Sequence, residues 1–281
     1  MLSYRHAFHA GNHADVLKHY LLSVVLDYFN QKPAPYFYVD THAGAGMYQL
    51  NDNFAQKNAE YENGIARLYT ANNLPDSVIN FVEFIKNINK NNALNFYPGS
   101  PAVAQRFLRE ADKMRLFELH PSDYKLLANT FGQNPRQTKL QNADGFAGIK
   151  AILPPPNKRA VVVIDPPYEL KDDYLRVVDC LKDSLKRFAT GTYMVWYPLL
   201  QRPEPAQMLA DLKKLNANNW LNVSLNVQKP SEDGYGMHGS GVFVINPPYT
   251  LPATLTEATP VLTKLLAMDS AADFRLDYQI S

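Results

Sequence analysis

Cysteine is almost absent from this chain, since Cys180 is the only one in 281 residues. A single thiol can form no internal disulfide, and it excludes every metal site that needs two or more cysteines. The chain also lacks a run of about 18 apolar residues, so we expect no membrane-spanning helix. Its start, MLSYRHAFHAGNHADV, has no apolar stretch behind a basic segment, so we expect no secretory signal. These absences favour a cytoplasmic protein.

A strong charge of either sign is missing too, because 28 Lys and Arg residues face 27 Asp and Glu residues, a net charge of +1. A nucleic-acid partner would therefore need a local basic face, because long-range steering is nearly absent. The hydrophobic content of 46% is enough for a full core. The length fits one α/β domain with an insertion, or a large and a small domain.

Short runs rich in β-branched and aromatic residues predict seven strands: 36–40, 114–119, 137–141, 160–165, 191–197, 220–227 and 241–246. Segments with helical spacing separate most of them, and this alternation predicts βαβ units in a mostly parallel sheet covered on both faces. The last two strands are joined only by KPSEDGYGMHGSG, which predicts an antiparallel hairpin. This order is typical of class I methyltransferases, which have a Rossmann-like fold.

Residues 48–96 are predicted to form a helical insertion subdomain within a single methyltransferase domain, 1–281. The distance from Gly46 to the next strand of the sheet is far more than one helix and its loops need. Helical patterns cover 59–71 and 76–90 in this segment. After it, Pro98-Gly-Ser100-Pro101 predicts that a crossover helix begins over 101–111, with Ser100 as its N-cap.

Polar residues follow three of the predicted parallel strands, whose carboxyl ends meet at the edge of the sheet where ligands bind. The first strand leads into a glycine turn, where Gly44 lets the backbone approach a ligand closely. Glu118 closes the second strand and could accept both ribose hydroxyls. Asp144 and Gly145 follow the third, where the Asp could accept an adenine amino group. Each acid alone could equally be a helix cap, and neither a dinucleotide fingerprint nor a phosphate-binding loop is present.

Two apolar runs end alike, in Asp165-Pro-Pro-Tyr168 and Asn246-Pro-Pro-Tyr249. Enzymes use such an ending to hold an exocyclic amino group for methylation. The Asp165 side chain and the Pro166 carbonyl can each accept one N–H, and Tyr168 can stack on a base swung out of its helix. Asn246 could accept the same bond, but it follows the final hairpin strand, away from the glycine turn. We therefore predict that Asp165 is catalytic and that the second copy only ends a strand.

Five of the seven histidines lie in the first 42 residues: His6, His9, His13, His19 and His42. The i,i+4 spacing of His9 and His13 raises the possibility of zinc, but HAGNH lacks the glutamate of a zinc-protease helix and no third ligand is evident. No metal is predicted. Instead, 13–29 predicts a helix whose Lys18 and His19 face the cofactor or the target.

The segments SYRHAFHAGNHADVLKH, DTHAGAG, YPGSP, FELHPSDY, ADGF, IDPPYE and RFATGTYMVWYP occur in this order. With them the chain resembles, over essentially its whole length, the bacterial J-type 23S ribosomal RNA adenine-N6 methyltransferases. The resemblance implies a monomer, without an obligate protein partner, that methylates one adenine in protein-free 23S RNA. It implies S-adenosylmethionine contacts at His19, His42, Ser100, Glu118, Asp144, Gly145 and Asp165. It also implies catalysis at Asp165, with Tyr4, His6 and Lys18 serving the substrate or a closing tail.

Two other functions compete with this interpretation. A DNA adenine-N6 methyltransferase would use the same motif, but no separate basic domain for target recognition is visible. Relatives have also been named for the use of external DNA, which suggests a non-catalytic nucleic-acid-binding protein. Such a protein would not need Asp165, the glycine turn and the strand-end acids together.

Overall fold

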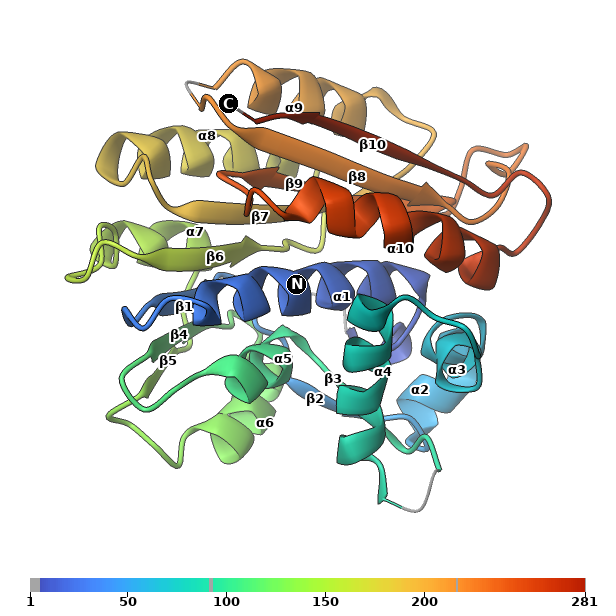
Figure 1. Ribbon diagram of the computed structural model, residues 1–281, viewed down its shortest axis with the longest axis horizontal. Coiled ribbons are helices and arrows are strands. Elements are labelled where there is room, and N and C mark those ends of the chain that lie inside the picture. The colour runs from blue at the N-terminus through green and yellow to red at the C-terminus, as the bar shows by residue number, and fades with distance from the viewer. Residues whose placement is uncertain (1–5, 91–92, 216, 281) are drawn as a thin grey trace.

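The computed structural model describes residues 6–90, 93–215 and 217–280. A sheet of eight strands, ordered β10-β8-β9-β7-β6-β1-β4-β5, runs through the molecule (Figure 1). Its strands are β1 (Phe37–Asp40), β4 (Lys113–Phe117), β5 (Thr138–Gln141), β6 (Ala160–Ile164), β7 (Thr192–Leu199), β8 (Trp220–Asn226), β9 (Gly239–Ile245) and β10 (Asp273–Gln279). The neighbouring strands β7, β6, β1, β4 and β5 are parallel to one another. β9 lies between β7 and β8 and is antiparallel to both. This is the predicted Rossmann-like methyltransferase sheet with its closing hairpin.

The eighth strand corrects the predicted count of seven. β10 pairs antiparallel with β8 along its whole length, from Asp273 opposite Asn226 to Gln279 opposite Trp220. Phe274 and Leu276 pack against the core from alternate positions. That alternation, in DFRLDYQ, is the period expected of a strand with one buried face.

Helices cover both faces of the sheet. α1 (His13–Asn30), α5 (Ser100–Phe107), α6 (Pro121–Phe131) and α10 (Leu251–Leu266) lie on one face, and α7 (Gly145–Gly148), α8 (Asp172–Arg187) and α9 (Pro203–Lys213) on the other (Figure 1). Neighbouring residues of β6 divide between the two cores, with Val161 in one and Val162 in the other. Over the described residues, no helix combines the length and apolarity needed to cross a bilayer.

α1 confirms the predicted helix and brings its side chains to the carboxyl edge of the sheet. Asn12 caps its start, since the side-chain oxygen accepts from the backbone N–H groups of Ala14 and Asp15 at 3.0 Å. Leu17 and Leu21 are fully buried against the sheet. The polar residues of the first turns are buried as well, which places Asp15, Lys18 and His19 inside the molecule rather than in solvent.

The segment predicted as an insertion contains α2 (Asn53–Asn58), the 3₁₀ helix η2 (Glu60–Asn63), α3 (Ile65–Tyr69) and α4 (Asp76–Ile88). It is framed by β2 (Met47–Gln49) and β3 (Phe96–Pro98), which pair antiparallel. The single helix expected over 59–71 is wrong, because Gly64 interrupts it. A Cβ on Gly64 would lie 2.0 Å from the carbonyl oxygen of Gly11, so the chain needs glycine at this crossing. The division into domain and insertion stays a prediction.

The crossover helix α5 begins one residue earlier than expected and ends at Phe107. Gly99 is its N-cap, so the expectation that Ser100 caps the helix is wrong. The Ser100 hydroxyl instead donates to Asp40 at 2.6 Å. This bond ties the start of α5 to the end of β1.

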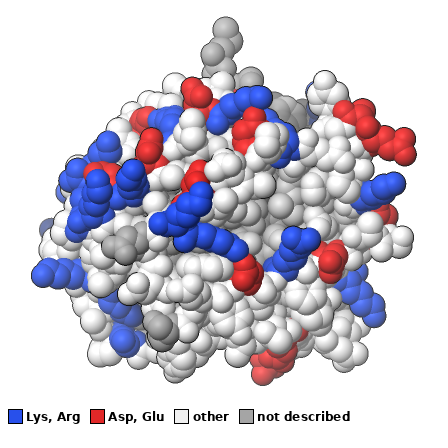
Figure 2. Space-filling model, turned by 90° about the horizontal axis from the view of Figure 1, so that it is seen from above, with Lys and Arg blue, Asp and Glu red and all other residues white. Residues whose placement is uncertain are grey.

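The surface carries both signs of charge. The face in Figure 2 shows lysine and arginine side chains interspersed with aspartate and glutamate rather than one continuous basic field. This distribution agrees with the net charge of +1. Any nucleic acid that binds here depends on contacts near the site, because distant surface charges largely cancel.

Candidate active site

A cavity of about 320 Å³ lies where the glycine turn after β1, the acid after β4 and the motif after β6 come together. Eleven of the residues predicted for the site line it: His6, Lys18, His19, His42, Gly44, Ser100, Glu118, Asp144, Gly145, Asp165 and Pro166. Tyr4 lies outside the described residues. Tyr168 does not line the cavity.

Glu118 stands at one side of the cavity, held by two backbone groups. Its Oε2 accepts from the N–H of Gly44 at 2.8 Å, and its Oε1 accepts from that of His120 at 2.7 Å. Burial raises the pKa of Glu118 to about 6, and the negative charges of Asp123 and Asp40 act in the same direction. The carboxylate is thus fixed by the glycine turn and poised to lose its charge just below neutral pH.

The sequence left open whether Asp144 caps a helix or lines the site, and in the structure it does both. Its Oδ1 accepts from the N–H of Phe146 at 2.9 Å and caps α7, while Oδ2 pairs with Arg176 at 2.5 Å. Next to it, a Cβ on Gly145 would lie 2.0 Å from the carbonyl oxygen of Thr41. Only glycine allows α7 to begin this close to the turn after β1.

His19 is buried and His42 is half-buried, and the loss of solvation lowers the pKa of both, that of His42 to about 4. Both imidazoles are therefore neutral at pH 7. The His19 ring lies within hydrogen-bond distance of the Tyr97 hydroxyl, at 3.0 Å, and that of His42 lies 2.8 Å from the Thr41 hydroxyl. Neutral rings fixed in this way can serve as hydrogen-bonding walls for a ligand, without adding charge to the cavity.

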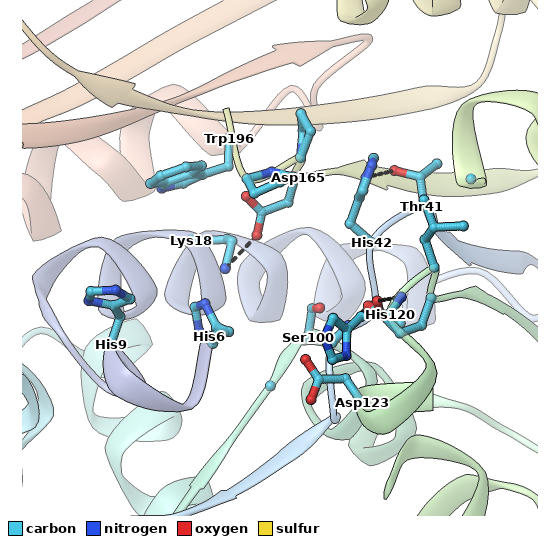
Figure 3. Close-up of a pocket in the computed structure, with 18 of the residues that line it drawn as sticks. His6, His9, Lys18, Thr41, His42, Ser100, His120, Asp123, Asp165 and Trp196 are labelled. Carbon is cyan, nitrogen blue, oxygen red and sulfur yellow. Dashed lines mark hydrogen bonds and ion pairs between the residues drawn. The ribbon is translucent and has the colours of Figure 1, made fainter. Parts of the chain in front are cut away.

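Asp165 faces the cavity and is paired with Lys18, which points at it from α1 (Figure 3). The Lys18 ammonium lies 2.6 Å from Asp165 Oδ2 and 3.0 Å from Asp15 Oδ1. Burial alone would lower the pKa of Lys18, but the two carboxylates outweigh it and raise the pKa. Lys18 is therefore charged. Because it occupies Oδ2, Asp165 keeps Oδ1 for an incoming donor.

Asp15 is a site residue that the sequence analysis missed. It is buried, and its Oδ2 accepts from the backbone N–H of Gly11 at 2.9 Å and lies 2.8 Å from His6 Nε2. Burial would raise the pKa of Asp15, but the charges of His6 and Lys18 lower it well below its ordinary value. Its place three residues before Lys18 was the available signal, since i,i+3 residues share a helix face.

Tyr168 requires a correction, because it was predicted to stack on the target base. Its backbone is left-handed, with φ at +52°, and this turns the ring into the core, where it is only 4% exposed. The hydroxyl donates to the carbonyl of Trp196 at 2.7 Å. The aromatic ring that lines the cavity near Asp165 and Lys18 is that of Trp196 (Figure 3).

The second proline motif lies at the opposite edge of the sheet. β9 is antiparallel to β7, so Ile245 pairs with Tyr193 at the start of β7, and Asn246 comes next. The Asn246 amide donates to the carbonyls of Ala189 and Gly191 at 2.7 and 2.8 Å. Its exclusion from the site is thus confirmed, and the side chain closes a loop.

His9 and His13, which have metal-like spacing, lie in different surroundings. The His9 ring is partly exposed and lies 2.8 Å from Glu60, whereas His13 is buried, which lowers its pKa to about 4. Over the described part of the chain, no group of three His, Cys, Asp or Glu side chains is placed to hold a metal ion.

Comparison with known proteins places the chain in a family. Residues 33–280 match the family described as ribosomal RNA large subunit methyltransferase D, RlmJ. The ribosomal RNA large subunit methyltransferases J of Escherichia coli K12 and Haemophilus influenzae are 45% and 43% identical to it. The first alignment covers 93% of each chain and the second 99%. The chain belongs to this methyltransferase family.

A solved structure agrees with the fold of this methyltransferase. A protein from Legionella pneumophila superposes with a TM-score of 0.89 at 34% identity, covering 96% of this chain and 98% of that one.

S-adenosylmethionine is the cofactor of this methyltransferase, and the residues of the cavity fit it. Glu118 offers a half-buried carboxylate to a ribose, and Asp144 offers an acceptor beside the start of α7. At Gly145 the chain lies so close to the carbonyl oxygen of Thr41 that no side chain could be accommodated. The cavity continues from these acids to Asp165, so a cofactor held by them would direct its methyl group toward the motif.

Proposed function

We propose that this methyltransferase transfers a methyl group from S-adenosylmethionine to the N6 amino group of a specific adenine in 23S ribosomal RNA, free of ribosomal proteins. One observation carries the proposal: Asp165, paired with Lys18, faces the same cavity as Glu118 and Asp144. The names of its relatives, both ribosomal RNA large subunit methyltransferases J, support RNA as the substrate.

The proposed chemistry begins with a weak nucleophile. The lone pair of an adenine amino group is delocalised into the ring, and S-adenosylmethionine supplies an electrophilic methyl group on a sulfonium. Asp165 and the Pro166 carbonyl each accept one N–H, which favours a pyramidal nitrogen with its lone pair aimed at the methyl carbon. Asp165 then takes the proton that the methylated nitrogen must lose. Its main contribution is position rather than basicity.

Lys18 gives Asp165 its direction in this proposal. The ammonium holds Oδ2, so Oδ1 is left to face the amine. Asp15 holds the same ammonium from behind and also contacts His6. Lys18 thus keeps a second carboxylate partner while Asp165 engages the substrate. Tyr4 and His6 belong to the segment proposed to close over the substrate.

Trp196 takes the stacking role first assigned to Tyr168. Its ring lines the cavity, with the Lys18 ammonium 5.8 Å from the ring centre. Stacking on such a ring offsets part of the cost of removing a base from its helix. The enzyme is proposed to act as a monomer in the cytoplasm, without an obligate protein partner.

DNA adenine methylation is the rival activity, because the motif serves both nucleic acids. The experiment that decides compares methyl-label incorporation from S-adenosylmethionine into naked 23S RNA, ribosomal subunits and DNA. We expect rapid incorporation into naked 23S RNA alone. Faster incorporation into DNA would reject the proposal, and incorporation into none of the three would reject nucleic-acid methylation altogether.

A further inference from the structure

Two strongly exposed apolar side chains belong to loops that contribute residues to the cavity lining. Leu170 is 65% exposed and Tyr235 is 80% exposed. Leu170 also lines the cavity, as does Met237, which follows Tyr235 by two residues. We refer to Leu170, Tyr235 and Met237 as the apolar rim. Its members belong to loops that follow different strands, so their gathering at one place is a property of the fold.

Both loops are anchored beside Asp165. Leu170 lies between β6 and α8, five residues after Asp165, and its carbonyl accepts from the N–H of Asp173 at 3.1 Å. The loop 227–238 joins β8 to β9, and the N–H of His238 donates to the carbonyl of Leu199 at 3.1 Å. Leu199 ends β7, which is parallel to β6. The rim therefore belongs to the edge of the sheet where the motif lies.

The backbone of the second loop turns Tyr235 outward. Gly234 and Gly236 on either side have φ values of +76° and +87°, which residues with a side chain rarely adopt. The N–H of Tyr235 donates to Asp233 Oδ1 at 3.1 Å, so the turn has a defined shape. A Cβ on Gly236 would meet no atom within 4 Å, so the loop is open to solvent at this glycine.

We infer that the apolar rim binds the RNA nucleotides on either side of the target adenine. An adenine that enters the cavity leaves its neighbours partly unstacked, with their faces exposed to water. An exposed aromatic ring and aliphatic side chains cover such faces. The neighbours of Tyr235 in the chain favour bases over phosphates as its ligand, because Glu232 and Asp233 are acidic. The inference rests on the proposed RNA substrate and extends it beyond the methylated base.

The test uses single substitutions with matched controls. Tyr235→Ala and Leu170→Ala remove the rim side chains. Tyr249→Ala removes the tyrosine that ends the second motif and is 72% exposed, and Leu175→Ala a leucine that is 62% exposed on α8 outside the cavity. Steady-state methylation of naked 23S RNA should show KM raised roughly fivefold to tenfold for each rim variant, with kcat changed less than twofold. Both controls should match the wild type, and Tyr235→Trp should retain the wild-type KM.

Salt dependence separates base contacts from phosphate contacts. Loss of a phosphate contact reduces the slope of log Kd against log salt, whereas loss of stacking raises Kd at every salt concentration without changing the slope. Filter binding of 23S RNA to wild type and Tyr235→Ala should therefore give parallel lines. Equal KM and Kd for rim and control variants would overturn the inference, as would a reduced slope. Binding is measured independently of turnover, so failure of the proposed activity would be seen separately, in the wild type.

Discussion

At the scale of single residues, Asp165 depends on a lysine that serves two carboxylates. Lys18 lies 2.6 Å from Asp165 and 3.0 Å from Asp15, and its own side chain is only 7% exposed. Removal of Asp165 therefore leaves Lys18 paired with Asp15 rather than as an unpaired buried charge. For this reason, substitutions at Asp165 should separate catalysis from folding.

Asp165→Ala should fold and bind S-adenosylmethionine. Its rate of methyl transfer should be lower than that of the wild type by about 100-fold or more, because no side chain remains to orient the amine. Asp165→Asn should retain part of the activity, since an amide oxygen accepts the same N–H. Single-turnover incorporation into naked 23S RNA measures both, with circular dichroism as the control for folding. An Asp165→Ala enzyme with the wild-type rate would remove Asp165 from the mechanism.

Glu118 predicts a pH-dependent affinity for the cofactor. Its pKa in the folded protein is about 6, above the ordinary 4.5, so ionisation lowers the stability of the cofactor-free protein as pH rises from about 4.5 to 6. The ribose hydroxyls need the ionised carboxylate as acceptor. The affinity for S-adenosylmethionine should therefore be highest above pH 7 and should decrease as the pH is lowered past 6. Calorimetry should give a Kd about tenfold higher at pH 5 than at pH 7.5.

Glu118→Gln is the control for this titration. It should bind weakly at every pH and lose the step near pH 6. A step that persists in Glu118→Gln would assign the titration to another group of the protein.

Residue types at strand ends could be predicted from the sequence, but their partners could not. Glu118, Asp144 and Asp165 were found because each follows an apolar run, and parallel strands bring such ends together. The pair of Lys18 with Asp165 joins residues 147 positions apart, and it depends on how α1 crosses the sheet. Tyr168 was misplaced because its left-handed backbone is not encoded in the motif.

At the scale of elements, the direction of β9 decides which proline motif can act. β6 is parallel to β1, so Asp165 after β6 lies on the same side of the sheet as the glycine turn after β1. β9 runs the other way, so Asn246 lies at the opposite ends of the strands. The two motifs, which differ only at their first residue, Asp165 or Asn246, therefore lie at opposite ends of the strands. The hairpin predicted from the glycine-rich segment 229–241 was sufficient to infer this.

Asn246→Ala should cost stability and leave catalysis intact. The amide makes two hydrogen bonds, and φ at Asn246 is +51°, so loss of the bonds and backbone strain together should lower the free energy of unfolding by about 1–3 kcal/mol. Denaturant unfolding measures the loss, and kcat per folded molecule should equal that of the wild type. Asn246→Gly relieves the backbone strain but does not restore the hydrogen bonds, so its free energy of unfolding should lie between those of Asn246→Ala and the wild type. A loss of kcat in either variant would contradict the assignment.

Elements that depend on tertiary contacts were harder to predict. The segment 59–71 does have a helical pattern, but the helix is interrupted at Gly64. There the chain crosses Gly11 so closely that an added Cβ would lie 2.0 Å from the Gly11 carbonyl oxygen. β10 was overlooked because its outer face is exposed and only Phe274 and Leu276 mark the inner one. The short elements β2, β3, α2 and α7 were not predicted either, because segments of three to six residues are too short to show a hydrophobic period.

At the scale of the whole molecule, the segment 48–96 reaches the site through Tyr48, which lines the cavity, and through Glu60, which contacts two residues of its lining. Glu60 Oε1 lies 2.8 Å from His9 Nδ1, and its Oε2 accepts from the Asn12 amide at 2.9 Å. Asn12 caps α1, which carries Asp15 and Lys18. The segment therefore supports the start of the helix on which the target side of the site depends.

Glu60→Ala should lower kcat about threefold to tenfold on 23S RNA while S-adenosylmethionine affinity changes less than twofold, because only the target side loses support. Kinetics and calorimetry on one preparation measure both. Glu62→Ala, an exposed acid of the same 3₁₀ helix that does not line the cavity, is the control. Equal losses of turnover and cofactor affinity would show that Glu60 stabilises the protein as a whole.

The most direct measurement identifies the methylated nucleoside. Naked 23S RNA is incubated with the wild-type protein and labelled S-adenosylmethionine, digested to nucleosides and separated by chromatography with mass detection. The geometry of Asp165 and Pro166 predicts that all of the label is in N6-methyladenosine, at one equivalent per RNA at completion. Label in a ring-nitrogen, carbon or ribose position would contradict the central claim that this site holds an exocyclic amino group.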